Sequence, residues 1–121
     1  MHILHVLHQY FPDHAGGTEH YVRALAQAQQ RAGHKVAIFF RESGEGRSLD
    51  RESEEGIRLY RATNGLFTPA RRFSSTLGDG FLAHSLIQIA AKGQPDVIHI
   101  HHLMGLPVNA VTALNPSVPL V

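Results

Sequence analysis

Histidines and glycines dominate the parts of this sequence that could do chemistry. Ten of the 121 residues are histidines, and a glycine pair, Gly16–Gly17, lies between an apolar and an amphipathic run in "YFPDHAGGTEHYV". Bare backbone at the start of a helix can bind a phosphate, because the first N–H groups are unpaired and glycine lets the anion approach. The pair could equally serve only as a tight turn from strand to helix, and both interpretations stay open at this point.

The glycine loop does not match the two common nucleotide-binding motifs. A dinucleotide fingerprint needs separated glycines and a third one three residues later, where this chain has His20. A P-loop needs G-K-[ST] after its glycines, and none follows here. An NAD site and an ATPase-type loop are therefore not expected.

A second group of histidines ends the segment "PDVIHIHH", residues 95–102. Side chains alternate along a strand, so His99 and His101 share a face while His102 opens the following loop. His101 and His102 fall at the carboxyl end of the strand, where they could hydrogen-bond a phosphate or acceptor hydroxyls. The alternative for both is a cap on the next loop, and His99 is expected to be a core histidine.

Metal binding requires three or four converging ligands. Only His99 and His101 share a face in their segment, whereas His2, His5 and His8 alternate sides along the first one. The sequence also has no helical H-E-x-x-H pair. No metal site is therefore expected.

Arg71 and Arg72 form an adjacent basic pair in a segment rich in turn-forming residues. Guanidinium groups bind phosphates and carboxylates through paired hydrogen bonds. The pair could contact a phosphorylated or acidic acceptor, or it could be a solvated loop pair.

The remaining pattern predicts the elements that position these residues. Short apolar runs alternate with amphipathic ones, which is typical of a parallel sheet covered on both faces. We expect a Rossmann-like, three-layer α/β fold whose fifth strand is cut short by the end of the chain. The expected strands cover 2–9, 34–40, 57–62, 95–102 and a start at 116; the helices cover 18–32, 81–92 and 105–115; the polar stretch 41–56 is expected to be a solvated loop.

Composition limits the function classes. The net charge of +1 gives no basic face for nucleic acid, and the absence of cysteine excludes disulfides and thiolate metal sites. No run reaches the roughly 18 apolar residues of a membrane span. A cytoplasmic protein is expected, with the parent enzyme able to sit at the inner surface of the membrane.

Three motifs in order carry a family resemblance that spans nearly the whole chain. These are "GGTE" (Gly16–Glu19), "RAGHKV" (Arg31–Val36) and "PDVIHIHHLMGL" (Pro95–Leu106). Together they resemble the N-terminal domain of the retaining glycosyltransferases of family 4, which have the GT-B fold. The resemblance implies an acceptor-side domain, 1–121, of an enzyme that moves a sugar from a nucleotide-diphosphate sugar to an acceptor with retention and without a required cofactor.

The resemblance also implies where the site lies. Gly16, Gly17 and Thr18 would face the donor diphosphate and the acceptor, together with His101 and His102. The family's E-x7-E element and basic pair belong to a C-terminal domain that has no counterpart in this chain. No catalytic residue is therefore assigned within it, and the chain alone is expected to be inactive.

Two other functions and one kind of partner stay open. The chain could be a free-standing nucleotide- or phosphate-binding module, or a histidine-based metal-binding protein. A sheet cut at its last strand leaves apolar surface unburied, so self-association through that side is expected. The acceptor, which could be a sugar or a lipid-linked one, is not indicated by any motif.

Overall fold

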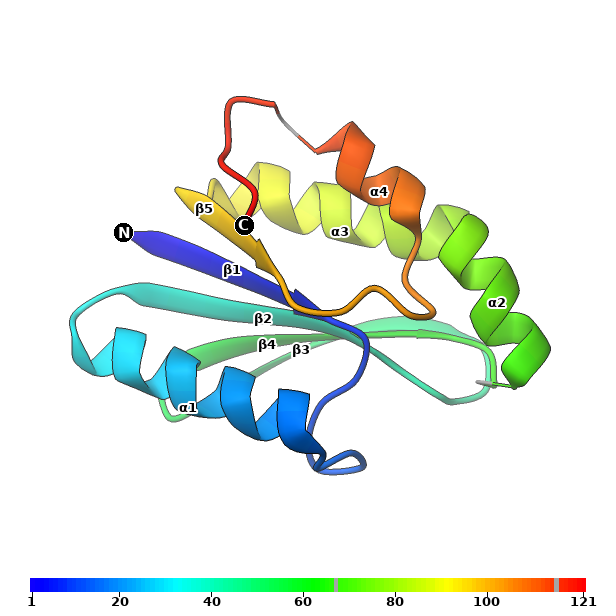
Figure 1. Ribbon diagram of the computed structural model, residues 1–121, viewed down its shortest axis with the longest axis horizontal. Coiled ribbons are helices and arrows are strands. Elements are labelled where there is room, and N and C mark those ends of the chain that lie inside the picture. Colours follow the sequence, from blue (N-terminus) through cyan, green and yellow to red (C-terminus); the bar gives the residue numbers. More distant parts are fainter. Residues whose placement is uncertain (67, 115) are drawn as a thin grey trace.

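The computed structural model describes residues 1–66, 68–114 and 116–121. Five strands and four helices follow one another in these ranges (Figure 1). In chain order they are β1 (His2–Leu7), α1 (Gly17–Arg31), β2 (Lys35–Glu42), β3 (Arg47–Glu54), β4 (Ile57–Asn64), α2 (Pro69–Leu77), α3 (Gly80–Gly93), β5 (Val97–Ile100) and α4 (Val108–Ala113).

The strands form one sheet in the order β3-β4-β2-β1-β5. β1, β2, β4 and β5 are parallel, and only β3 is antiparallel to its neighbour β4. α1 covers one face of the sheet, while α2, α3 and α4 lie on the other (Figure 1). The predicted three-layer α/β fold is therefore confirmed, and its sheet is mixed instead of purely parallel.

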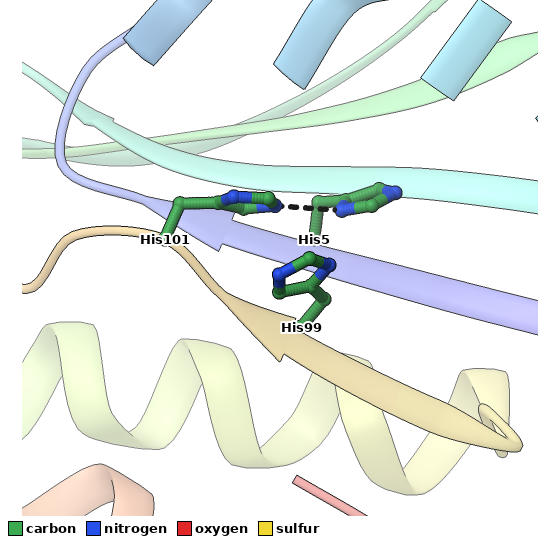
Figure 2. Close-up of side chains that lie close together, drawn as sticks. All are labelled: His5, His99 and His101. Carbon is green, nitrogen blue, oxygen red and sulfur yellow. Dashed lines mark hydrogen bonds between the residues drawn. The ribbon is translucent and has the colours of Figure 1, made fainter. Parts of the chain in front are cut away.

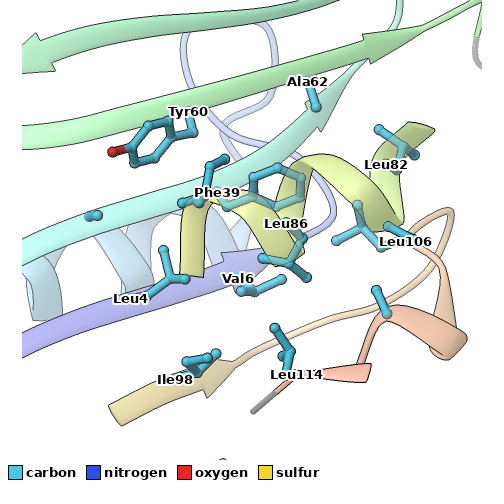
Figure 3. Packing of buried hydrophobic residues seen from close by; sticks show 14 residues of the cluster. Leu4, Val6, Phe39, Tyr60, Ala62, Leu82, Leu86, Ile98, Leu106 and Leu114 are labelled. Carbon is cyan, nitrogen blue, oxygen red and sulfur yellow. The ribbon is translucent and has the colours of Figure 1, made fainter. Parts of the chain in front are cut away.

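β2 lies inside this sheet because both of its faces are apolar. Phe39 points into the cluster formed with α3 and α4, where it meets Val6 and Leu86 (Figure 3). Phe40 points to the opposite side and packs with Val22 of α1. All five side chains are buried. The continuous apolar run thus marks a strand covered on both faces.

The polar stretch 41–56 was expected to be a loop, and this prediction is wrong. Its first two residues end β2, and residues 47–54 form β3, an edge strand whose charged residues face solvent. Its ladder with β4 includes an ion pair between Arg61 and Glu52, at 2.7 Å. Only Leu49 packs against the core, so the strand lacks the apolar alternation by which strands are recognised. Charged side chains of this kind protect an exposed sheet edge from pairing.

The end of the chain pairs only briefly with the sheet. Leu120 forms a parallel bridge with Ile98 beside β5, which is the beginning of the strand expected from residue 116. The helix expected over 105–115 is shorter, Val108–Ala113, and residue 115 lies outside the described ranges. The segment around Arg71 and Arg72, expected to be a turn region, contains α2. Among the described helices, none is both long and apolar enough to cross a membrane.

Candidate functional site

The carboxyl ends of β1 and β5 lie side by side because these strands are parallel neighbours. His8 follows the end of β1, and His102 follows the end of β5 shortly after Ile100. In open parallel sheets this edge is where ligands bind. The two histidine rings meet there, with 4.2 Å between their centroids.

The glycine pair forms the start of α1 at the same edge. Gly16 is the N-cap residue, with φ −83° and ψ −172°, and Gly17 is the first residue of the helix. Neither has a positive φ, so the backbone conformation does not require glycine at either position. The turn interpretation therefore does not explain why both residues are glycine.

The surroundings of the two glycines differ. A Cβ atom on Gly16 would lie 2.9 Å from Oε2 of Glu19, so this position is restricted by the packed carboxylate. A Cβ atom on Gly17 would meet nothing within 4 Å. Nothing in the described structure accounts for the glycine at 17. Its bare backbone leaves room for a ligand at the N-terminus of a helix, where partial positive charge attracts anions.

Glu19 organises this loop and was not assigned a role from the sequence. Its side chain is 1% exposed and accepts a hydrogen bond of 2.5 Å from Nε2 of Gln9. Burial by itself would raise the pKa of Glu19, but the bond from Gln9, a backbone N–H and the nearby His8 and His14 bring it below its usual value. An ionised carboxylate thus joins the residues after β1 to the first turn of α1. The signal that could have found it is the spacing from the N-cap, where an acid three residues on is typical of a helix start.

His8 is the buried polar group at the centre of the edge. Its side chain is 8% exposed, and its Nδ1 atom has no hydrogen-bond partner among the described residues. Burial lowers the pKa of His8 to about 4, with a further lowering by His102 and smaller effects of Glu19, Arg72 and His14. A neutral imidazole whose Nδ1 has no partner among the described residues therefore lies at this edge. His8 could not be selected among its neighbours from sequence alone, because its importance depends on the pairing of β1 with β5.

Acid is expected to destabilise the fold through His8. The unfolded chain takes up a proton at the ordinary pKa of 6.5, while the folded state resists it until about pH 4. The unfolded state therefore binds more protons between these values, and the free energy of unfolding falls as the pH falls through this window. Glutamine cannot take up this proton. Between pH 6.5 and pH 4 we therefore expect the free energy of unfolding of His8→Gln to fall by about 1–3 kcal/mol less than that of the wild type. Urea unfolding at several pH values in the presence of a chelator measures the slope.

The matched control for this prediction is His20→Gln, since His20 is exposed in the first turn of α1. It should keep the wild-type dependence on pH. If His8→Gln keeps it as well, the buried imidazole is not what makes the fold sensitive to acid.

The predicted histidines at the end of β5 take two different positions. His102 is exposed at the edge, and its Nδ1 accepts a hydrogen bond from the Met104 N–H at 3.2 Å. His101 instead turns onto the face of the sheet covered by α1, where its Nε2 lies 2.9 Å from Nδ1 of His5 (Figure 2). His99 stacks on His101, with 3.9 Å between the ring centroids. The structure thus brings His102 to the glycine loop's edge and groups His101 with two other histidines.

Arg71 and Arg72 of the basic pair also take different positions. Arg71 is exposed in the first turn of α2, and its Nη2 donates to the carbonyl oxygen of Asn64 at 3.3 Å. Arg72 is half-buried, and its charge lowers the pKa of His8, which places it at the candidate site. Beside it lies an open cavity of about 450 Å³. The lining residues are Pro69, Arg72, Phe73, Thr76 and Met104.

Arg41 forms buried hydrogen bonds near this edge of the sheet, and the sequence analysis did not identify it. It is the next-to-last residue of β2, and its side chain is 1% exposed. Its Nη1 donates to the carbonyl oxygen of Gly105 at 2.9 Å and its Nη2 to that of Asn64 at 3.2 Å. A charge following an apolar run resembles the start of a loop, so the sequence gives no sign that this guanidinium is buried.

A family model for the glycosyl transferase 4-like domain matches residues 16–121, which contain both the glycine loop and the histidine segment. The chain belongs to this family. No curated protein matches the sequence.

Two solved structures share the fold of this glycosyl transferase 4-like domain. One is sucrose-phosphate synthase from Thermosynechococcus elongatus, with a TM-score of 0.65 and 23% identity. The other is the catalytic domain of starch synthase IV from Arabidopsis thaliana bound to ADP and acarbose, with a TM-score of 0.59 and 16% identity. Each alignment covers 86% of this chain and 28% of the other. The chain therefore spans about a quarter of the length of the proteins that it matches.

Proposed function

We propose that this domain is the acceptor-side part of a retaining glycosyltransferase that uses a nucleotide-diphosphate sugar as donor. Membership of the glycosyl transferase 4-like family and the GT-B-type neighbours support sugar transfer. The carrying observation is the open backbone of Gly17 at the N-terminus of α1, at the same sheet edge as the unpartnered Nδ1 of His8. That combination fits an anionic, hydrogen-bonding ligand such as a diphosphate.

The chemistry of such a site follows from where charge develops. In sugar transfer the bond between the anomeric carbon and the diphosphate oxygen breaks, a bond from that carbon to an acceptor hydroxyl oxygen forms, and the hydroxyl proton passes to the leaving diphosphate. Negative charge accumulates on the leaving diphosphate, and oriented N–H groups stabilise it best when they are already in place. The first N–H groups of α1 would serve this purpose at Gly17 and Thr18. Arg72, whose charge acts on His8, would add positive charge to the site.

The acceptor would approach from the end of β5 and the start of α2. His102 is exposed there, and the cavity beside Arg72 combines that cation with the apolar surfaces of Phe73 and Met104. A ligand with a charged or hydroxylated head and an apolar part would match this lining. Since nucleotide sugars are the proposed donors, we place the reaction in the cytoplasm.

Titration with UDP, ADP and GDP tests the proposed function. We expect millimolar binding by the 121-residue chain, because it supplies only one wall of the proposed site. The amide signals of Gly16, Gly17 and Thr18 should shift in NMR spectra, together with those of His102. Loop amides that stay unmoved at millimolar nucleotide, or shifts confined to other parts of the chain, would contradict the proposal.

A pair of glycine substitutions separates ligand contact from folding. Gly17 and Gly80 are both the first residue of a helix, and a Cβ atom on either meets nothing within 4 Å. Gly17→Val should weaken nucleotide binding by about tenfold, because a side chain displaces the anion from the backbone. Gly80→Val should leave binding unchanged, since it changes α3 in the same manner away from the site.

A further inference from the structure

The pairing of β1 with β5 brings together three histidines that lie far apart in the sequence. The two strands are parallel, with His5 directly opposite His99. Neighbouring residues in this register share a face, and His101 lies two positions beyond His99 on that same face. All three side chains therefore gather on the side of the sheet covered by α1 (Figure 2). The sequence expectation that too few histidines share a face considered each segment alone and missed His5.

The three imidazoles are close enough to share one ion. One ring nitrogen from each of His5, His99 and His101 lies within 4.8 Å of the others. Nδ1 of His5 and Nε2 of His101 are 2.9 Å apart. Nitrogen ligands of a tetrahedral Zn²⁺ at about 2.0–2.1 Å are roughly 3.3 Å from one another. The three ring nitrogens would reach that geometry if His5 and His101 moved slightly apart and the half-buried His99 rotated.

A neighbouring side chain prepares His5 for this role. Oε1 of Gln29, on α1, accepts a hydrogen bond from Nε2 of His5 at 2.7 Å. An amide oxygen only accepts, so the proton of His5 is on Nε2 and the lone pair is on Nδ1. In the absence of a metal that lone pair accepts the hydrogen bond from Nε2–H of His101. A metal bound at Nε2 of His101 would leave the proton of that ring on Nδ1. A hydrogen-bonded partner behind the ligand nitrogen is the usual companion of histidine in metal sites.

The three side chains differ in how far they are buried. His5 is fully buried, whereas His99 and His101 are half-buried, so the cluster is accessible from one side. A fourth position would be open to water or to an anion.

The donor set selects the class of ion. Three neutral nitrogen ligands suit Zn²⁺ and its neighbours among the divalent transition metals, whereas Mg²⁺ and Ca²⁺ prefer oxygen ligands. We propose that His5, His99 and His101 form a binding site for a divalent transition-metal ion such as Zn²⁺, with Gln29 as the positioning residue for His5. Such a site would join β5 to β1 on the face of the sheet that α1 covers. It is independent of the diphosphate site proposed above.

Metal titration of the 121-residue chain after treatment with a chelator tests this site. We expect one Zn²⁺ per chain by calorimetry, no competition by Mg²⁺, and the strong visible absorption of tetrahedral cobalt when Co²⁺ is used instead. His99→Gln and His101→Gln, both at half-buried positions, should weaken Zn²⁺ binding by more than the roughly 10–100-fold expected for Gln29→Ala. Zn²⁺ should also raise the thermal midpoint of the wild type more than that of these variants.

Two controls exclude binding at other histidines. His84 is exposed on α3, and Nδ1 of His34 lies 3.1 Å from the N-terminal amine, where ions could bind adventitiously. His84→Gln and His34→Gln should bind Zn²⁺ as the wild type does. The proposal is overturned if either control loses the ion, if His99→Gln and His101→Gln keep it, or if less than one equivalent binds.

A measurement on the wild type avoids reliance on substitutions in the core. The imidazole ¹⁵N signals of Nδ1 of His5 and Nε2 of His101 should move when Zn²⁺ is added, while Nε2 of His5 keeps its proton and its bond to Gln29. Unchanged signals at both nitrogens would also overturn the proposal.

Discussion

Replacing Glu19 with alanine is expected to lower the free energy of unfolding by about 2–4 kcal/mol, because a buried charged hydrogen bond disappears and its donor is left unpaired. The carboxylate is 1% exposed and holds Gln9 at 2.5 Å, so water cannot easily replace it. Its charge also lies in the first turn of α1, where negative charge is stabilised by the helix dipole. Chemical denaturation of the purified variant measures the loss.

Two further variants divide this effect into its parts. Glu19→Gln keeps the shape and an oxygen that can accept from Gln9, but it removes the charge, so we expect a loss of only about 1 kcal/mol. Glu45 is exposed between β2 and β3, and Glu45→Ala should change stability by less than about 0.5 kcal/mol. Equal losses for Glu19→Ala and Glu45→Ala would show that Glu19 does not hold the loop.

The effect of Glu19 on the site should be visible besides its effect on stability. A Cβ atom on Gly16 would lie 2.9 Å from Oε2 of Glu19, so the carboxylate packs directly against the N-cap residue. Hydrogen exchange of the Gly17 and Thr18 amides should accelerate in Glu19→Ala more than the global loss of stability explains. Exchange that rises uniformly over α1 would instead assign Glu19 a general role in folding.

The layers of this fold could be predicted from the sequence because the buried strands have their own signature. The run ending at Phe40 is apolar on both faces, which only a central strand explains. Gly33, with φ 94°, ends α1 where a left-handed residue is favourable. β3 could not be predicted because its stability comes from pairing with β4 and from charge pairs such as Arg61–Glu52. Contacts between two strands do not produce an alternation of apolar and polar residues within either strand.

The candidate site was predictable only in part, for a similar reason. The loop at Gly17 could be selected from its local sequence, because glycines at the start of a helix let an anion approach the unpaired N–H groups. His8 and His5 have no distinctive neighbours in sequence, and their significance comes from β5 lying next to β1. Register between strands far apart in the chain decides which histidines meet, and one sequence does not contain that information.

Arg41→Met is expected to lower the free energy of unfolding by about 2–4 kcal/mol, because the carbonyl groups of Gly105 and Asn64 would lose a charged donor. Methionine keeps most of the apolar stem, so the loss reports mainly on hydrogen bonding and less on a cavity. The exposed Arg58 on β4 provides the matched control, and Arg58→Met should cost less than about 0.5 kcal/mol. A variant at position 41 as stable as this control would mean that the two carbonyls find other donors.

The same substitution should loosen the candidate site, because Arg41 joins β2 to the loop that follows β5. That loop carries His102 and is otherwise held by short contacts, including the Gly105 N–H donating to Oγ1 of Thr76 at 2.6 Å. We expect faster hydrogen exchange at Gly105 and Leu106 in Arg41→Met than in Arg58→Met, measured under conditions where both remain folded. If the loop amides exchange alike in the two variants, Arg41 stabilises the core without positioning the loop. If they differ, a guanidinium buried beneath the sheet edge fixes where His102 stands relative to His8.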